Sequence, residues 1–291
     1  MWFLTSEGMD RYNGRNIKHY KLQDDSAQTP SVHLGWLYID NKGRIWVAGK
    51  KGRIFHYSET YDKFDVIKQL PESAHTINYA FLDKQDNFWL CGKDTITLYN
   101  TDNKTCVEIP YVSGSTITNI EQLDKNRFFI ATDTGIKYVL LKGNRLTVIN
   151  LKQLQKINAQ INELYYHAKS QRLFIGTFGY GIFAYDMRTG KIIHSDQTLN
   201  DVSINHIQPL DDTTLLVATE GMGVYKINVN TCMTEPYIVA NYESYNEMNG
   251  NNINDIYIDD KKRIWLANYP AGVTVIDFRY KNYHWIKHSI G

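Results

Sequence analysis

The chain has 291 residues, with 32 basic and 31 acidic side chains and a formal net charge of +1. This balance argues against a nucleic-acid partner recognised through bulk positive charge. The three cysteines, Cys91, Cys106 and Cys232, show no Cys-x-x-Cys spacing, so the sequence indicates neither a metal motif nor a disulfide framework. No apolar run approaches the roughly 18 residues that cross a bilayer, and no signal-peptide pattern precedes the first expected strand.

A unit of short strands recurs through the whole chain. Three clear copies are IDNKGRIWVAGKKGRIFHY at 39–57, LDKQDNFWLCGKDTITLY at 82–99 and IDDKKRIWLANYPAGVTVID at 258–277. Each copy has an aliphatic residue and Asp, a polar turn, an apolar run, a second turn and an alternating run. The apolar runs contain anchor residues 40 to 49 positions apart, namely Trp2, Trp46, Trp89, Phe129, Phe174, Leu216 and Trp265. Short strands repeated at this period are typical of β-propeller blades.

We therefore predict an all-β fold, a seven-bladed β-propeller of four-stranded antiparallel blades, as a single domain over residues 1–291. Within each blade the strands are called a to d in chain order. The first blade is expected to be incomplete, with strands b, c and d near 2–5, 9–12 and 16–22 but no strand a, which suggests a fragment of a longer protein. A short helical pattern at 152–160 is expected to be a loop decoration. The expected blade limits are approximately 1–33, 34–74, 75–115, 116–159, 160–202, 203–251 and 252–291.

Two turn positions recur and have a structural interpretation. An Asp at the start of the a–b turn can accept hydrogen bonds from backbone amides ahead of it, and a Gly six or seven residues after the anchor allows a positive φ or a close backbone approach. These aspartates occur once per blade and lack the clustered oxygen ligands that calcium requires, so we predict turn capping rather than metal binding. His167 stands where the blade at 160–202 would carry this Asp. The aspartates are Asp40, Asp83, Asp124, Asp211 and Asp259, and the glycines are Gly8, Gly52, Gly135, Gly181, Gly223 and Gly272.

The repeat also carries a family pattern. Asp40, Gly43, Trp46 and Gly52 follow it in one copy, and the segments 2–12, 131–138 and 176–186 carry its second half. This pattern resembles the two-component regulator propeller repeat, over essentially the whole chain. The resemblance implies the periplasmic sensor region of a hybrid two-component system of the Bacteroidetes type, with a sensor histidine kinase and a response regulator. In that family tandem propellers precede a Tyr-rich sandwich domain, and the ligands are typically oligosaccharides.

The resemblance implies a function and a set of partners. The leading hypothesis is an extracytoplasmic, periplasmic propeller that binds an oligosaccharide and relays occupancy to a histidine kinase and transcription regulator outside this chain. The implied partners are a neighbouring propeller or sandwich domain of the same protein and a second copy in a homodimer. We expect no cofactor, no metal and no nucleic-acid contact.

Two alternatives belong to other functional classes. One is a propeller enzyme, a lyase or hydrolase acting on a glycan or a macrocycle, and the other is a protein-interaction scaffold. Catalysis needs an acid–base group at the site, and only Glu163 and His206 are weak candidates for that role. We therefore assign no catalytic residue and do not expect this chain to be an enzyme.

Candidate ligand-binding residues lie in the d–a and b–c loops, which emerge at the same end of a blade and in a propeller surround the mouth of the central channel. A saccharide needs flat apolar faces and polar groups for its hydroxyls. For any single residue, packing within or between blades is the competing interpretation. His167 and His206 have no partner at a metal or triad spacing in the sequence, so packing is expected for both. The predicted ligand-binding residues are Trp36, Lys50, Asn78, Tyr79, Tyr180, Asn205, His206 and Tyr269.

Overall fold

The computed structural model describes residues 1–22, 34–49, 52–67, 70–71, 74, 76–111, 115–195, 197–240, 248, 250–279 and 282–286. They form a seven-bladed β-propeller of antiparallel sheets, six with four strands and the first with three. The predicted fold class and the incomplete first blade are therefore confirmed. Within the described ranges, no helix is long and apolar enough to cross a membrane.

The chain divides into two compact units. The first unit comprises Met1–Phe128 and Val139–Ile149, and the second comprises Phe129–Tyr138 and Asn150–Gly291. The boundary runs through the fourth sheet, so blades 1 to 3 belong to the first unit and blades 5 to 7 to the second. The expectation of a single domain stays a prediction.

The first four sheets account for β1 to β15. Blade 1 contains β1 (Trp2–Leu4), β2 (Met9–Tyr12) and β3 (Ile17–Tyr20), and blade 2 contains β4 (Leu34–Ile39), β5 (Ile45–Gly49), β6 (Arg53–Ser58) and β7 (Lys63–Val66). Blade 3 contains β8 (Tyr79–Leu82), β9 (Asn87–Cys91), β10 (Thr95–Asn100) and β11 (Cys106–Pro110). Blade 4 contains β12 (Ile117–Gln122), β13 (Arg127–Thr132), β14 (Gly135–Lys142) and β15 (Arg145–Ile149).

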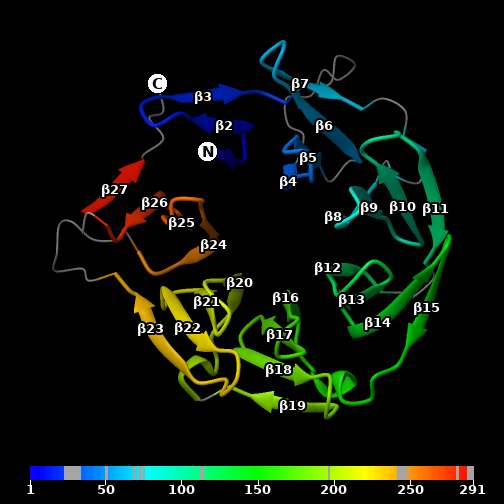
Figure 1. Ribbon diagram of the computed structural model, residues 1–291, viewed down its shortest axis with the longest axis vertical. Coiled ribbons are helices and arrows are strands. Elements are labelled where there is room, and N and C mark those ends of the chain that lie inside the picture. Colours follow the sequence, from blue (N-terminus) through cyan, green and yellow to red (C-terminus); the bar gives the residue numbers. More distant parts are fainter. Residues whose placement is uncertain are drawn as a thin grey trace. The chain divides into compact units, whose positions relative to one another are not determined.

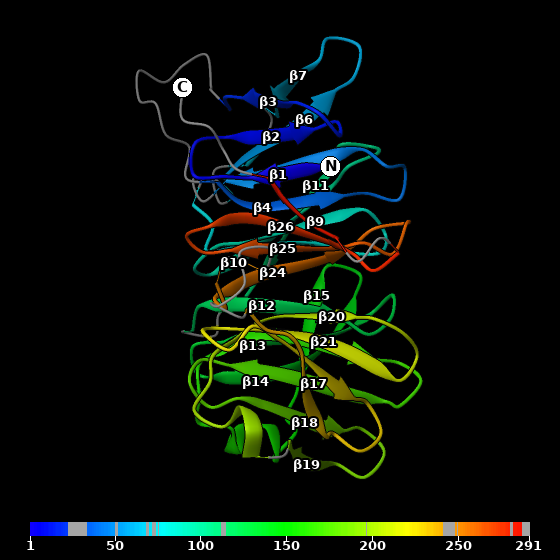
Figure 2. The same cartoon turned by 90° about the vertical axis from the view of Figure 1, so that its left-hand side faces the viewer.

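The last three sheets account for β16 to β27. Blade 5 contains β16 (Ile161–His167), β17 (Arg172–Thr177), β18 (Ile182–Asp186) and β19 (Lys191–His194), with strands side by side in chain order (Figure 1). Blade 6 contains β20 (Ile204–Pro209), β21 (Thr214–Thr219), β22 (Val224–Asn228) and β23 (Thr234–Ile238). Blade 7 contains β24 (Ile253–Ile258), β25 (Ile264–Asn268), β26 (Gly272–Asp277) and β27 (Asn282–Ile286), and Figure 2 shows β24, β25 and β26 as neighbours. Two short 3₁₀ turns accompany the strands, η2 (Leu154–Lys156) in the predicted decoration and η3 (Gln197–Leu199) before blade 6.

The apolar core lies between successive blades rather than inside any one of them. One cluster joins Phe174 and Ile182 of blade 5 to Ile207 and Val217 of blade 6, and a second joins blade 6 to blade 7. In the first unit, equivalent clusters join blades 1 and 2 and blades 2 and 3. Strand b is the most continuously apolar strand because both of its faces are covered. In β17 and β21, five consecutive residues are buried.

A buried Asp–Trp hydrogen bond closes the a–b turn in three blades. Asp259 Oδ2 accepts the Trp265 indole N–H at 2.9 Å, while its Oδ1 accepts the backbone amides of Lys261 and Arg263. Asp40 with Trp46 and Asp83 with Trp89 repeat this arrangement at 2.8 and 2.9 Å. Burial works against the charge of Asp259, but the bonds from Trp265 and Arg263 outweigh it and hold the pKa of the carboxyl below its usual range. The predicted turn-capping role is confirmed.

His167 takes over this cap in blade 5. Its Nδ1 lies 2.8 Å from the Ser170 hydroxyl and accepts the Ser170 backbone amide at 3.2 Å. Burial lowers the pKa of His167, which favours the neutral ring that this acceptor role requires. The residue that departs from the Asp pattern thus preserves the function of the cap, and the packing role expected for His167 is confirmed.

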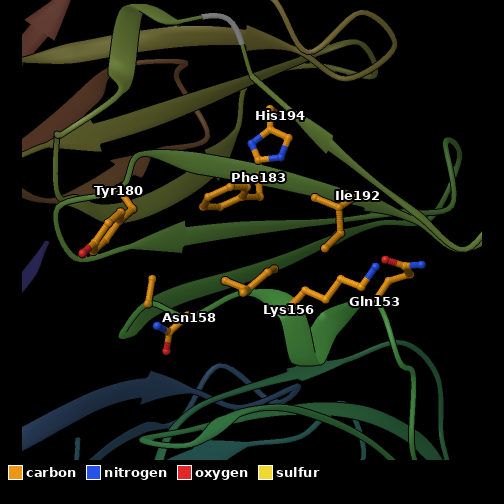
Figure 3. A pocket seen from close by; sticks show the side chains of 9 residues that line it. Gln153, Lys156, Asn158, Tyr180, Phe183, Ile192 and His194 are labelled. Atoms are coloured by element: carbon orange, nitrogen blue, oxygen red, sulfur yellow. The ribbon is translucent and has the colours of Figure 1, made fainter.

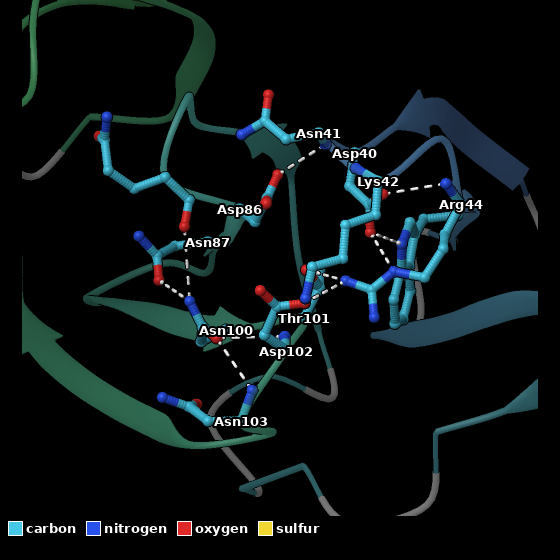
Figure 4. Close-up of polar contacts among 12 residues, drawn as sticks. Asp40, Asn41, Lys42, Arg44, Asp86, Asn87, Asn100, Thr101, Asp102 and Asn103 are labelled. Atoms are coloured by element: carbon cyan, nitrogen blue, oxygen red, sulfur yellow. Dashed lines mark hydrogen bonds and ion pairs between the residues drawn. The ribbon is translucent and has the colours of Figure 1, made fainter.

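Charged side chains clasp blades 2 and 3 together beside these turns. Arg44 donates from Nε to Asp40 at 2.6 Å and from a terminal nitrogen to Asp102 of the next blade at 2.6 Å (Figure 4). Lys42 also reaches Asp102, at 2.7 Å. Asp86 accepts the backbone amide of Asn41 at 3.0 Å. The same end of the blades therefore carries both the caps and an interblade ion network.

A second clasp attaches the three-stranded blade 1 to blade 2. Asp62 accepts hydrogen bonds from the hydroxyls of Tyr20 and Tyr57, each at 2.6 Å, and pairs with Lys18. Trp2 packs against the rings of Tyr20 and Tyr57 at centroid distances of 5.2 and 4.7 Å. The rings of Trp2, Tyr20 and Tyr57 thus pack blade 1 against blade 2.

Replacing Asp259 by Ala tests the cap. The variant leaves the buried Trp265 N–H and two turn amides without an acceptor, so we expect the free energy of unfolding to fall by about 2–4 kcal/mol. Urea denaturation measures this loss. The matched control is Asp260→Ala, because the neighbouring Asp260 is exposed and its removal deletes the same charge. Equal losses for the two variants would contradict the capping role.

Gly223 occupies a position where a side chain cannot fit. Its φ is +82°, and a Cβ atom there would lie 2.5 Å from the Ile238 carbonyl oxygen. Gly221 has a similar φ of +87° but open space around it. Gly223→Ala is therefore expected to lower the free energy of unfolding, measured by urea denaturation, by at least about 2 kcal/mol more than Gly221→Ala does. Both variants strain the backbone, but only the new methyl group at position 223 clashes with a neighbouring atom. Similar costs for both would show that the close approach is unimportant.

Candidate functional site

The inner strands of blades 5, 6 and 7 begin with the same local irregularity. The sequence reads Ile-Asn-Glu at 161, Ile-Asn-His at 204 and Ile-Asn-Asp at 253. In each strand the pairing register shifts between the Ile and the third residue, so that the Asn forms a β-bulge. A bulge re-aims the side chains next to it, and here it occurs at the same place in three neighbouring blades.

The bulged asparagines link one blade to the next. Asn162 donates from its side-chain amide to the Ile204 carbonyl at 3.2 Å, and Asn205 donates in the same way to Ile253 at 2.9 Å. Each bond satisfies a carbonyl at the start of the following inner strand. Asn205, a predicted ligand residue, therefore has a structural role in holding β20 against β24.

This alignment places the three following side chains in a row. His206 Nδ1 lies 2.8 Å from Asp255 Oδ1, and His206 Nε2 lies 3.8 Å from Glu163 Oε1. The His206 side chain is 26% exposed and that of Asp255 is 67% exposed. We call Glu163, His206 and Asp255 the inner-strand ladder. It places one imidazole between two carboxylates from three successive blades.

The protonation of His206 follows from its neighbours. Burial works against the charged ring, but the hydrogen bond and charge of Asp255, followed by the charge of Glu163, outweigh it and raise the pKa of His206 to about 9. Nδ1 also lies 3.2 Å from the Ile256 amide, which donates to Asp255 at 2.8 Å. A single ring nitrogen cannot both donate and accept a hydrogen bond. We assign the proton to Nδ1, which donates to Asp255, because the contact with Asp255 is shorter than the contact with the Ile256 amide. At neutral pH the ladder holds an imidazolium.

The b–c loops of the same blades surround the start of these strands. Phe178, Glu220 and Tyr269 donate their backbone amides to Gln160, Ser203 and Asn252, respectively, at 2.9 to 3.0 Å. Each of the three loops is therefore anchored two residues before the bulged Asn. Phe178, Tyr180 and Tyr269 keep their rings exposed, with 64% of Tyr269 open to solvent. This end of blades 5 to 7 combines aromatic faces with the polar ladder.

The charge of this end is acidic. Glu163, Glu220 and Asp255 contribute carboxylates, whereas the described residues 160–163, 178–181, 203–206, 220–223, 250–255 and 268–271 include no Lys or Arg. In the part of the chain that the structure describes, no three His, Cys, Asp or Glu side chains are grouped as metal ligands. The arrangement suits hydrogen bonds to neutral hydroxyl or amino groups better than to an anion.

The structure separates the predicted ligand residues into two sets. Trp36 and Tyr79, in the first unit, meet edge to face at 5.6 Å, and Trp36 packs on the core between blades 2 and 3. Asn78 is exposed and donates its backbone amide to Cys91. Lys50 lies outside the described residues. The other set lies in the second unit and comprises Tyr180, Asn205, His206 and Tyr269. Of these, Asn205 and His206 are adjacent at the bulge of β20.

The sequence offered Glu163 and His206 only as weak acid–base candidates, and the structure gives His206 two carboxylate partners, Glu163 and Asp255. Glu163 and Asp255 stand 43 positions before and 49 positions after it in the sequence, so no local spacing reveals them. The signal in the sequence is Ile-Asn followed by Glu, His or Asp, which occurs once in each of blades 5, 6 and 7. Alignment of the repeats by this tripeptide, rather than by the Trp anchors, places the three side chains in register.

Comparisons with known proteins support the fold. No protein-family model and no curated protein matches the sequence. Among solved structures, the extracellular domain of a protein described as a hybrid two-component system of B. thetaiotaomicron matches with a TM-score of 0.73 and 18% identity. The extracellular domain of a protein described as a one-component system of the same organism matches with a TM-score of 0.73 and 19% identity. Virginiamycin B lyase from Staphylococcus aureus matches with a TM-score of 0.68 and 14% identity.

The extent of these matches differs. The matches to the two extracellular domains include 94% and 95% of this chain, respectively. The chain spans only 38% and 37% of the length of those domains. For the lyase, 94% of this chain matches 89% of the enzyme. Extracellular domains of two-component systems therefore share this propeller fold, in agreement with the resemblance of the repeats. At these identities the likeness is one of fold.

The ladder predicts a pH dependence that His206→Gln removes. Because the folded-state pKa of His206 is raised from 6.5 to about 9, its stabilising contribution is complete below about pH 6.5 and is lost as the pH rises through about 9. Over that range we expect the unfolding free energy of the wild type to fall relative to His206→Gln by up to about 3 kcal/mol. Urea denaturation at several pH values measures this difference.

A titration of His206 by NMR provides the direct check. Asp255→Asn should lower the pKa of His206, whereas Asp260→Asn, in the exposed a–b turn, should leave it unchanged. An unperturbed His206 pKa in the wild type would rule out the ladder as described.

Proposed function

We propose that this chain is an extracytoplasmic ligand-sensing propeller that binds an oligosaccharide and reports its presence to a histidine kinase and transcription regulator outside this chain. The proposal includes a periplasmic location and a neighbouring propeller or sandwich domain, or a second copy, as the partner in signalling. The repeat resemblance and the likeness in fold to extracellular domains of two-component systems support it.

The observation that carries the proposal is the chemistry of the inner-strand ladder and the loops around it. Exposed rings such as Tyr269 offer flat faces to the C–H surfaces of a sugar. The ladder offers carboxylate acceptors, of which Asp255 is the most exposed. Because three blades contribute side chains, an extended ligand contacts several sheets at once. The acidic balance favours a neutral saccharide or an amino sugar over an acidic glycan at this end.

The enzyme alternative has one specific observation in its favour, the His206 ring between two carboxylates. A general base operates best with a pKa near the working pH. With a pKa of about 9, only roughly 1% of the rings are neutral at pH 7. His206 is therefore better suited to an ion pair or a hydrogen-bond donor than to proton abstraction, which favours binding over catalysis.

Calorimetric titration and thermal shift with neutral, amino and acidic oligosaccharides test the proposal. A neutral or amino oligosaccharide at about 100 times its dissociation constant should add about 2.7 kcal/mol of stability. Tyr269→Ala and His206→Gln should each weaken that binding about five- to tenfold, since a lost ring contact or hydrogen bond is worth about 1–1.5 kcal/mol.

Tyr61→Ala is the matched control, because Tyr61 is equally exposed but lies in a c–d turn of the first unit. It should bind like the wild type. Consumption of the oligosaccharide, followed by chromatography, would support the lyase or hydrolase alternative. No binding of any neutral or amino saccharide would overturn the proposed ligand class.

A further inference from the structure

A groove of about 410 Å³ lies in the second unit, between blade 5 and the segment that precedes it. Tyr180, Phe183 and Ile192 of blade 5 line one wall, and Gln153, Lys156 and Asn158 line the other (Figure 3). Its volume is within the range of small-molecule sites, which is about 300–1,000 Å³. None of the ladder residues lines it.

The wall opposite blade 5 is built by the predicted loop decoration. Leu154, in η2, is fully buried, and Ile157 is nearly so. Burial of these two side chains holds the segment in the fold, whereas Gln153 and Lys156 on the same segment are exposed. The 3₁₀ turn ends at Lys156, which places a cation at the end of this segment. The decoration therefore has a defined surface.

The groove combines an apolar wall with a cationic rim. The Phe183 ring meets His194 at 5.0 Å and 69°, which holds the ring in place. Tyr180 is exposed at the mouth. Lys156 is exposed and has no ion pair among the described residues, and no carboxylate is among the lining residues. A ligand that fits this surface has a flat apolar face and a negative charge.

We propose that this groove binds a small anion with a flat apolar body, the chemistry shared by a uronic acid and an aromatic carboxylate. The ligand's body packs on Phe183 and Tyr180, and its carboxylate reaches Lys156 and the side-chain amides of Gln153 and Asn158. The site is distinct from the inner-strand ladder and has the opposite charge, so the two select different ligands. The proposal stands independently of a saccharide at the ladder.

Ligand-detected NMR titrations of the purified chain test the site with four probes. Glucuronate and 4-hydroxyphenylacetate are the two acids, and glucose and 4-hydroxyphenylacetamide are their neutral counterparts. Each acid that binds should do so at least about tenfold more tightly than its neutral counterpart, a difference expected of one charge-assisted contact. Binding of one acid alone identifies the sugar or the aromatic source of the ligand.

Two lysine variants decide whether the groove is responsible. Lys156→Gln should weaken acid binding about tenfold, while Lys152→Gln, which removes an exposed lysine from the same segment outside the groove, should change it less than about twofold. Phe183→Leu should weaken acids and neutral counterparts alike. Equal effects of the two lysine variants, or binding of neither acid at millimolar concentration, overturn the proposal.

Testing each variant against the ligand of the other site distinguishes this groove from the proposed oligosaccharide site. His206→Gln should leave binding of the acids unchanged, and Lys156→Gln should leave binding of a neutral oligosaccharide unchanged. Loss of acid binding in His206→Gln would place the anion elsewhere and contradict the groove.

Discussion

The structure depends on one constraint, that each blade has two apolar faces and no means of covering them alone. The b strands are buried along almost their whole length, and each core cluster described above takes residues from two adjacent blades. A four-stranded sheet of this kind is stable only against a neighbour on either side. The repeat period and the interblade clasps all follow from this requirement, and so does the side-by-side placement of the inner strands.

The polar groups at the two ends of a blade have different roles. At the a–b turns, buried carboxylates satisfy the turn amides and the indole N–H groups, and Arg44 extends this network to the next blade. Polar groups at that end are used within the fold. At the b–c loops, glycines with positive φ let backbones approach closely, and side chains of the loops and bulges remain open to solvent. Chemistry available to a ligand is therefore concentrated at this second end.

Charge distinguishes the two surfaces of the second unit. The ladder shares one imidazolium between two carboxylates, and no described Lys or Arg compensates the remaining negative charge. The groove beside blade 5 has a lysine and no carboxylate in its lining. Opposite charges on the two surfaces allow discrimination between ligands that share a sugar-like or aromatic body, because placing an anion beside carboxylates of like charge is costly.

The sequence by itself determined the repeat, the strand order, the incomplete first blade and the capping role of Asp40, Asp83 and Asp259, because these depend on periodicity and on contacts within one turn. It also singled out His206 and Tyr180, but not their surroundings. Only the tertiary structure decided that His206 pairs with Glu163 and Asp255, and that Tyr180 and Lys156 line the same groove. The physical reason is that both sites combine separate strands or segments, whose alignment depends on bulges, interblade hydrogen bonds and buried anchors rather than on sequence spacing.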